Sequence, residues 1–193
     1  QYVYNGDYGS NKVKFGAYYG GSSKRNIKNV DLKNNRKNTW GTGLIFNHEI
    51  DSIQNVTVAA GFTRQISENA NKTAYYSNAY ALGLAYNFVH TTYGLDLAHK
   101  DTKNKGGAGN KVKNNEVTAV IRQGLNEDWN VYAMYSYKTE KTLPVGSAYS
   151  KSTDRQFLVG TEYYVFKQGS VKVKPFIEWQ ATRTKYENTF DKD

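Results

Sequence analysis

Apolar and polar residues alternate with a period of two from one end of the chain to the other, and this restricts the fold more than any other feature. In the clearest run, Tyr76–Phe88, mostly Tyr, Leu and Phe alternate with Ser, Ala, Gly and Asn. Successive side chains of a strand point to opposite faces, so each run predicts a strand with two different faces. No segment carries the 3.6-residue stripe of an amphipathic helix. The sequence therefore predicts an all-β protein.

The runs predict about ten antiparallel strands of roughly 9 to 14 residues, the length with which a tilted strand crosses a bilayer. Gln1–Tyr8 is included as the first strand. The other runs are Val13–Tyr19, Trp40–Phe46, Val56–Phe62, Tyr76–Phe88, Tyr93–Leu97, Val117–Ile121, Trp129–Tyr137, Phe157–Val165 and Val171–Ala181. A β-bulge is expected near Arg64, and Pro175 disturbs the last run because proline lacks the N–H that a sheet needs.

The predicted connections alternate in length. The shorter ones are His48–Asn55, Asn87–Thr92, Gly124–Asp128 and Lys167–Ser170. The longer, polar ones are Ser22–Lys37, Ser67–Thr73, Asp101–Val112 and Glu140–Asp154. Short turns at one end and long loops at the other are typical of outer-membrane barrels, and a soluble sandwich has no reason to alternate in this way.

Composition agrees with a folded chain that has a polar interior. The 193 residues are 38% hydrophobic but 15% aromatic, with 17 tyrosines, and disordered chains are poor in aromatic residues. No cysteine is present, which excludes disulfides and thiolate metal sites. No run approaches the roughly 20 apolar residues of a membrane helix, and the start lacks the pattern of a signal peptide. Residues 1–193 are expected to form a single domain.

The two faces of the predicted strands carry different residues. One face places aromatic residues near strand ends, where a membrane–water interface favours them. These are Trp40, Tyr76, Tyr86, Tyr93, Trp129, Tyr137, Tyr163 and Trp179. The other face carries many Gly and Ala, an unusual choice for an exposed strand of a soluble sandwich. The sequence therefore predicts an antiparallel, up-and-down transmembrane β-barrel in a bacterial outer membrane.

The inward face of such a barrel holds the candidate site, a polar pore lining. The lining residues are predicted to be Lys14, Tyr18, Asp96, Lys100, Glu116, Arg122, Tyr132, Lys138, Glu162, Lys172, Lys174 and Glu178. Lys14, Arg122, Lys138, Lys172 and Lys174 would attract anions, with Asp96, Glu116, Glu162 and Glu178 as counter-charges. Tyr18 and Tyr132 would stack on sugar rings. The alternative is a salt-bridge network inside a closed barrel.

Catalysis and metal binding find little support. The three histidines, His48, His90 and His99, lack metal-ligand spacing, so neither a cofactor nor an enzymatic activity is expected. His99 beside a serine of a neighbouring strand would imitate a barrel lipase, although an interfacial histidine is the simpler interpretation. Gly106–Gly109 lacks the strand-then-helix context of a phosphate-binding loop.

The chain has a net charge of +9, and much of its positive charge lies in two predicted loops. The cations are Lys24, Arg25, Lys28, Lys33, Arg36 and Lys37 in one, and Lys103, Lys105, Lys111 and Lys113 in the other. If these loops face outward, outer-membrane lipid and lipopolysaccharide are the expected partners, although solvated loop charge is the plainer and favoured interpretation. Nucleic acid is not expected, since the tyrosines do not form a base-stacking surface beside the charge.

The stretch VKVKPFIEWQATRTKY, Val171–Tyr186, resembles the penultimate strand of small Gram-negative outer-membrane porins of the OmpG-like and oligogalacturonate-specific type. The Asn-, Lys- and Tyr-rich usage is also similar to that of fusobacterial porins. The resemblance implies a sugar- or ion-conducting barrel of twelve to fourteen strands, with Lys172, Lys174 and Glu178 in its lumen. The chain departs from it by ending at Thr189–Asp193 without a closing aromatic strand and by its lower strand count. Two expectations follow: a barrel of about ten strands, or a larger one with strands outside these residues.

These observations predict a channel for passive diffusion of small hydrophilic solutes, with a weak preference for anions or acidic sugars, as a monomer or homotrimer. A closed barrel that acts as an adhesin or structural envelope protein through its basic loops is the first alternative. A soluble all-β carbohydrate-binding domain is the second, and it would be stable without detergent.

Overall fold

The computed structural model describes residues 1–21, 35–68, 74–104, 111–143, 148–168 and 171–190. Every regular element in these ranges is a β-strand, and no helix among them is long and apolar enough to cross a membrane. The strands are β1 (Tyr2–Tyr8), β2 (Asn11–Gly20), β3 (Asn35–Asp51), β4 (Gln54–Glu68), β5 (Ala74–Phe88), β6 (Thr91–Asn104), β7 (Lys111–Gly124), β8 (Trp129–Leu143), β9 (Ala148–Tyr163), β10 (Phe166–Gln168), β11 (Val171–Val173) and β12 (Phe176–Phe190).

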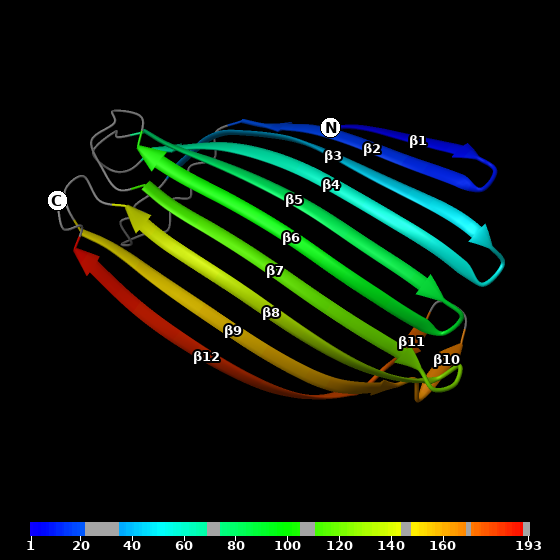
Figure 1. The fold of residues 1–193 in the computed structure, drawn as a ribbon. Coiled ribbons are helices and arrows are strands. Elements are labelled where there is room, and N and C mark those ends of the chain that lie inside the picture. Colours follow the sequence, from blue (N-terminus) through cyan, green and yellow to red (C-terminus); the bar gives the residue numbers. More distant parts are fainter. Residues whose placement is uncertain (22–34, 69–73, 105–110, 144–147, 169–170, 191–193) are drawn as a thin grey trace.

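Ten of these strands form one antiparallel sheet in the order β1-β2-β3-β4-β5-β6-β7-β8-β9-β12. Within this sheet each strand pairs with the preceding strand of the sheet, and β12 pairs with β9. The predicted all-β, up-and-down arrangement of about ten strands is therefore confirmed. The sheet curves into an open trough with β1 and β12 at its two far edges (Figure 1). Within the described ranges no ladder joins β1 to β12, so the closed barrel of the sequence prediction is not part of this structure.

Most strands are longer than their apolar runs. β3 covers 17 residues, whereas its run covers only Trp40–Phe46. Asp101–Asn104 and Lys111–Val112, assigned to a loop from the sequence, are the ends of β6 and β7. Two short connections shrink to Ser52–Ile53 and Val89–His90, and Val89 has a positive φ of 54°. The polar residues at the strand ends therefore mark the end of the apolar band and not the end of the strand.

The register has two kinds of irregularity, and the predicted bulge is not one of them. β4 and β5 pair without interruption through Arg64, whereas β3 carries register shifts at Arg36/Asn38 and Glu49/Asp51. The predicted last strand is broken at Pro175, which has no N–H to donate to a ladder. Beyond this break, β10 and β11 continue the β9–β12 hairpin with a one-residue change of register.

The sheet is a single layer without an apolar core. None of the described hydrophobic side chains is buried, and the buried residues in the described ranges are Thr39, Gly41, Ser136 and Thr153. Large hydrophobic side chains such as Leu44 and Trp179 are 44% and 59% exposed. What covers the two faces of the sheet therefore decides how the protein can be stable.

Candidate functional site

The register brings most of the predicted lining residues onto one face of the sheet. Residues paired across neighbouring strands share a face, and the row through Glu116 runs from Gly16 through Gly43, Gly61, Ala81 and Ala98 to Lys138. The predicted residues on this face are Lys14, Tyr18, Asp96, Lys100, Glu116, Arg122, Tyr132, Lys138, Glu162 and Glu178. Their role as a pore lining remains a prediction.

Side chains of this face reach across an intervening strand, which places the face on the inside of the curve. Tyr18 Oη on β2 lies 2.9 Å from Thr63 Oγ1 on β4, and its ring lies over Gly41 of β3. Tyr132 Oη on β8 donates to Glu178 Oε1 on β12 at 2.6 Å, with its ring over Gly160 of β9. Both tyrosines predicted to stack on sugars therefore lie against the concave wall, each on a glycine of the next strand.

Glu162 is the centre of an ionic cluster near the short-turn end of the concave face. Its Oε1 accepts a hydrogen bond from Arg122 Nη2, and its Oε2 accepts one from Lys174 Nζ at 2.5 Å. The Lys174 ammonium also lies 5.4 Å from the centre of the Tyr164 ring. Lys174 precedes Pro175 and has the same parity as Glu178, and its ammonium reaches Glu162 on the concave face.

Most of the remaining predicted residues line two hollows of the concave face, and one lies on the β10–β11 hairpin. Lys100, Glu116 and Lys138 help to line a hollow of about 460 Å³ over β3–β8. Lys14 and Asp96 help to line a second hollow of about 630 Å³. Lys172 lies on the β10–β11 extension, paired in register with Lys167, and is not brought together with the others.

The structure also shows charged residues of the concave face that the sequence prediction missed. By register, Asp7, Glu49, Glu140 and Asp154 share this face, together with Lys12, which lies 2.6 Å from Glu49. These four acids offset the excess of cations in the predicted set. Two of them lie in the stretch 140–154, which was assigned to a loop, and the alternation of the strands would have found them if those ends had been extended.

The two halves of the concave face differ in side-chain size. From β2 to β6 the face is lined by Gly16, Gly43, Ala59, Gly61, Ala79, Ala81, Gly83, Ala85, Gly94 and Ala98. From β7 to β12 it carries the ionic cluster, Glu116, Lys138 and Tyr132. The small half leaves space in front of the wall but also carries Lys14, Asp96 and Lys100, whereas the large half carries the ionic cluster.

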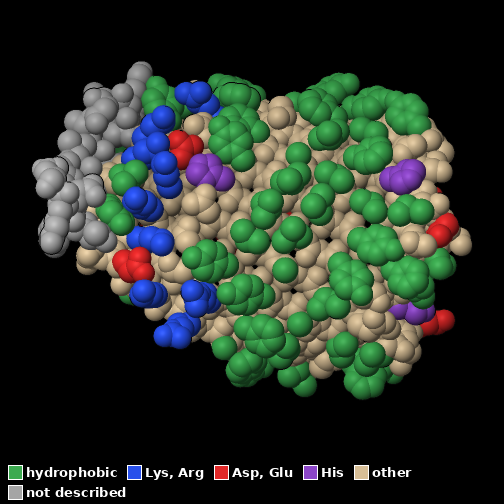
Figure 2. Space-filling model, viewed as in Figure 1, with side chains coloured by type: hydrophobic (Ala, Val, Ile, Leu, Met, Phe, Trp, Pro, Cys, Tyr) green, Lys and Arg blue, Asp and Glu red, His purple; other side chains and the backbone are tan. Residues whose placement is uncertain are grey.

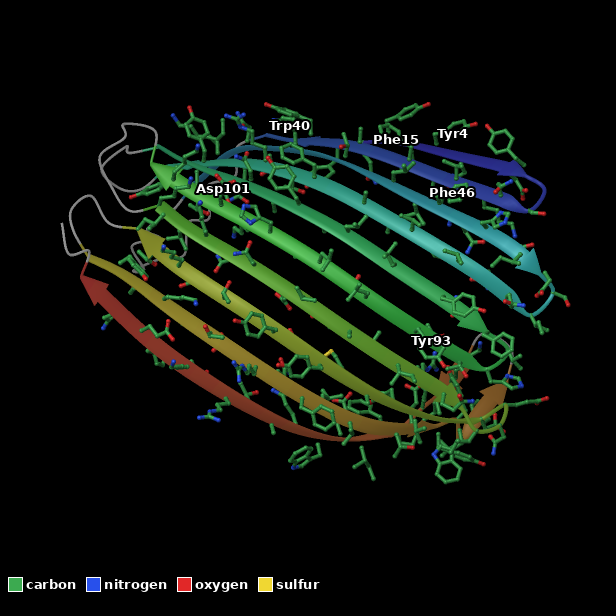
Figure 3. The ribbon with its side chains drawn as sticks, viewed as in Figure 1. Tyr4, Phe15, Trp40, Phe46, Tyr93 and Asp101 are labelled. Carbon is green, nitrogen blue, oxygen red and sulfur yellow. The ribbon has the colours of Figure 1, made fainter. Side chains whose placement is uncertain are left out.

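The convex face carries an apolar band without Asp, Glu, Lys or Arg among its described residues (Figure 2). Aromatic residues stand at both borders of the band, as Trp40 and Phe46 do on β3 and Tyr80 and Tyr86 on β5 (Trp40 and Phe46 are labelled in Figure 3). The aromatic residues predicted to face outward from strand ends share this face by register. The soluble sandwich interpretation would bury these rings, whereas Tyr80 and Trp40 are 49% and 40% exposed.

The band runs obliquely across the hydrogen-bonded rows. Followed through the paired residues of successive strands, the row of Trp40 reaches Lys151 on β9, six strands away. The aromatic border of the band on β9 lies at Phe157, six residues from Lys151. The opposite border shifts equally, because the row of Phe46 reaches Phe157 and the border stands at Tyr163. The border therefore shifts by one residue, about 3.3 Å, from each strand to the next, which lies about 4.8 Å away. This shift corresponds to a strand tilt of about 35°.

Beyond the border of the band at the long-loop end, the convex face is strongly basic (Figure 2). We call these nine outward residues the basic belt: Arg64, Lys103, Lys111, Lys113, Lys141, Lys151, Arg155, Arg183 and Lys185. Among the side chains that the structure describes in this region, the acids are Asp101, labelled in Figure 3, and Glu187. Of the cations predicted to be in loops, Lys103, Lys111 and Lys113 lie on β6 and β7, and Arg36 and Lys37 lie on β3. Lys24, Arg25, Lys28, Lys33 and Lys105 lie outside the described residues.

The histidines lie apart from one another. His48, predicted to be in a turn, lies on β3 with its Nδ1 2.9 Å from Asn11 Oδ1, and His90 lies in the Val89–His90 turn. His99 Nδ1 lies 2.7 Å from Asn115 Oδ1, so its described partner is an amide and not a serine. No group of three metal-binding side chains occurs in the part of the chain that the structure describes. Gly106–Gly109 lies outside that part.

Comparison with known proteins gives no relative: no family model, no curated protein and no solved structure matches the chain.

Proposed function

We propose that this chain forms the wall of a β-barrel in a bacterial outer membrane and acts as a channel for small hydrophilic solutes. The observation that carries the proposal is the contrast between the faces of one sheet: a polar, concave face and a convex band free of charged residues. Water-soluble sheets bury their apolar face, and this sheet has nothing among the described residues to cover it. A lipid bilayer supplies that cover.

The oblique course of the band supports a bilayer in particular. A bilayer is a flat slab, so its two borders stay parallel while tilted strands pass through them. Between β3 and β9 both borders of the band shift by the same six residues against the register. The resulting tilt of about 35° lies in the range of transmembrane barrels. A partner protein with its own irregular surface gives no reason for two parallel borders.

The free edges of β1 and β12 place a condition on this proposal. In hydrocarbon, backbone N–H and C=O groups have no water to bind, so both edges have to be paired in the membrane. In a barrel of these strands alone, β12 and β1 pair with each other. In a larger barrel, further strands lie between them.

The concave face favours a channel with weak charge selectivity. Its small half, from β2 to β6, leaves space for water, and its charges of both signs bind ions and sugar hydroxyls at close range. The offsetting acids Asp7, Glu49, Glu140 and Asp154 reduce the preference for anions that the predicted set alone implied. The expected solutes are therefore small and polar, with charge as a secondary criterion.

Single-channel recording in a planar bilayer tests the proposal. The purified, folded protein is added to one side, and a salt gradient gives the ratio of cation to anion permeability. Discrete and stable conductance steps with a small reversal potential are expected. Heat-modifiable migration in gel electrophoresis shows whether the protein is folded and inserted. A bilayer without conductance, although the protein is folded and inserted, contradicts the channel and leaves a closed structural barrel.

A further inference from the structure

Four cations of the basic belt gather around a hollow on the convex face of β9 and β12. Lys151, Arg155, Arg183 and Lys185 line this hollow of about 420 Å³ together with Tyr137, Thr153 and Glu187. All of them point away from the concave face by register. The hollow therefore opens toward whatever surrounds the sheet and takes no part in the channel.

Arg155 and Arg183 are directly opposite each other in the β9–β12 ladder. Like charges at such a position are unfavourable, unless an anion lies between them. The single acid of the hollow does not serve this purpose, since Glu187 binds Lys185 at 2.7 Å and lies 3.8 Å from Lys151. Arg155 lies 5.9 Å from the centre of the Tyr137 ring, and neither arginine has an ion pair within the described ranges. Two guanidinium groups thus stand side by side without a carboxylate.

The next outward residues along both strands belong to the apolar band. Phe157 follows Arg155, and Trp179 lies beyond Arg183 and Ala181. The rings of Phe157 and Trp179 lie edge to face with their centres 6.2 Å apart. Arg155 therefore stands one row, about 7 Å along the strand, from Phe157, and Arg183 stands two rows from Trp179, so cations lie close to rings of the apolar band. This is the order of groups in a lipid with a phosphate headgroup.

We propose that the hollow binds the phosphate-bearing headgroup of an anionic lipid, with the acyl chains lying over Phe157 and Trp179. The inference rests on the proposed membrane location of the sheet. Arginine is suited to this task because its planar fork donates two parallel hydrogen bonds to phosphate oxygens. Lys151 and Lys185 contribute further charge at the rim. A headgroup phosphate between Arg155 and Arg183 removes the repulsion within the pair.

The test measures binding of diphosphoryl lipid A to the detergent-folded full chain, in parallel with phosphatidylcholine and inorganic phosphate. Wild-type protein is expected to retain lipid A, and Arg155→Gln/Arg183→Gln to bind it at least roughly tenfold more weakly. Lys111→Gln/Lys113→Gln, which removes the same charge from the same face on β7, is expected to change binding by less than about twofold. Arg155→Lys/Arg183→Lys is expected to restore part of the affinity.

Equal losses in the two glutamine variants would overturn the site and leave only a general charge effect. Binding of inorganic phosphate as strong as that of lipid A would overturn the lipid as its occupant, and absence of lipid A binding by wild type would overturn both. In detergent without phosphate, Arg155→Gln/Arg183→Gln is expected to unfold at the same or a higher temperature than wild type, because a repulsive pair is removed. A lower temperature assigns the arginines a structural role and contradicts the proposal.

Bilayer recording separates this inference from the proposed function. Because the hollow is on the convex face, Arg155→Gln/Arg183→Gln is expected to keep the wild-type conductance. If the wild-type protein forms channels but shows no preference for lipid A, the headgroup site is contradicted and the proposed channel is not. Failure of the wild type to insert contradicts the membrane location, on which both depend.

Discussion

Lys174 Nζ lies 2.5 Å from Glu162 Oε2, although Lys174 lies next to Pro175 in the break between β11 and β12. Because Arg122 binds the other oxygen of the same carboxylate, one half-buried acid holds two cations from β7 and from the segment before β12. This arrangement ties the irregular end of the last hairpin to the regular part of the sheet.

Glu162→Gln is expected to release both cations. The free energy of unfolding should fall by about 1–3 kcal/mol, since Arg122 and Lys174 lose a charged partner. The reversal potential in a salt gradient should shift toward anions, because the concave face gains positive charge. Denaturant unfolding in detergent and bilayer recording check the two effects. Glu140→Gln, which removes an acid without an ion pair among the described residues, is the control and should leave stability nearly unchanged.

Gly160→Ala is expected to displace the Tyr132 ring. A Cβ at Gly160 would stand 2.5 Å from Cζ of that ring, which is closer than real contacts allow. The ring must move and its hydrogen bond to Glu178 is lost, at a cost of about 1–3 kcal/mol. Gly43→Ala is the control, because its Cβ would meet the nearest atom, the Ala60 carbonyl oxygen, at 3.7 Å. Equal thermal unfolding of the two variants would show that Tyr132 does not pack on Gly160.

Leu82 and Ala81 are neighbours in the chain on opposite faces of β5, so they allow a matched test of the membrane location. Leu82→Lys places a charge in the middle of the apolar band and should cost about 2–4 kcal/mol in a bilayer. Ala81→Lys places the same charge on the concave face and should be nearly neutral. The fraction that folds into lipid vesicles measures both. If Leu82→Lys folds as well as Ala81→Lys, the convex band does not face lipid.

Amide hydrogen exchange of β12 tests the condition on the sheet edges. In vesicles, amides of β12 that face away from β9 should be protected, because an edge in lipid has to be paired. The central strand β5 is the internal reference and should be protected in any folded state. If the amides of β12 exchange rapidly in vesicles while those of β5 are protected, the edge is unpaired. This result would contradict insertion of the whole sheet.

Period-two alternation predicted the approximate strand number and the shared face of most lining residues, Lys172 excepted, because side-chain parity follows from strand geometry alone. Trp40 and Trp179 lie on the same face as predicted, although they are on distant strands. Glu178 lies on the concave face for the same reason, since its parity within β12 survives the break at Pro175.

Strand ends, bulges and the distribution of charge could not be predicted in this way. Polar ends such as Asp101–Asn104 look like loops, because a strand that leaves an apolar environment changes composition without changing conformation. The bulge expected near Arg64 lies in β3 instead, since the register of a ladder depends on both partners. The Arg155–Arg183 pair is a contact between strands, which the sequence of either strand does not contain.

The unequal halves of the concave face have a consequence for the path of a permeating molecule. Glycine and alanine line β2–β6, while Tyr132, Arg122 and Lys174 project from the opposite side. In the proposed channel, the widest space for water therefore lies in front of β2–β6, where the small side chains are interrupted only by Lys14, Asp96 and Lys100 among the charged residues of the predicted lining. The bulkier charged side chains approach a solute from β7–β12. If the sheet forms this channel, we expect a solute with one charged edge to permeate differently from a solute whose charge is spread evenly.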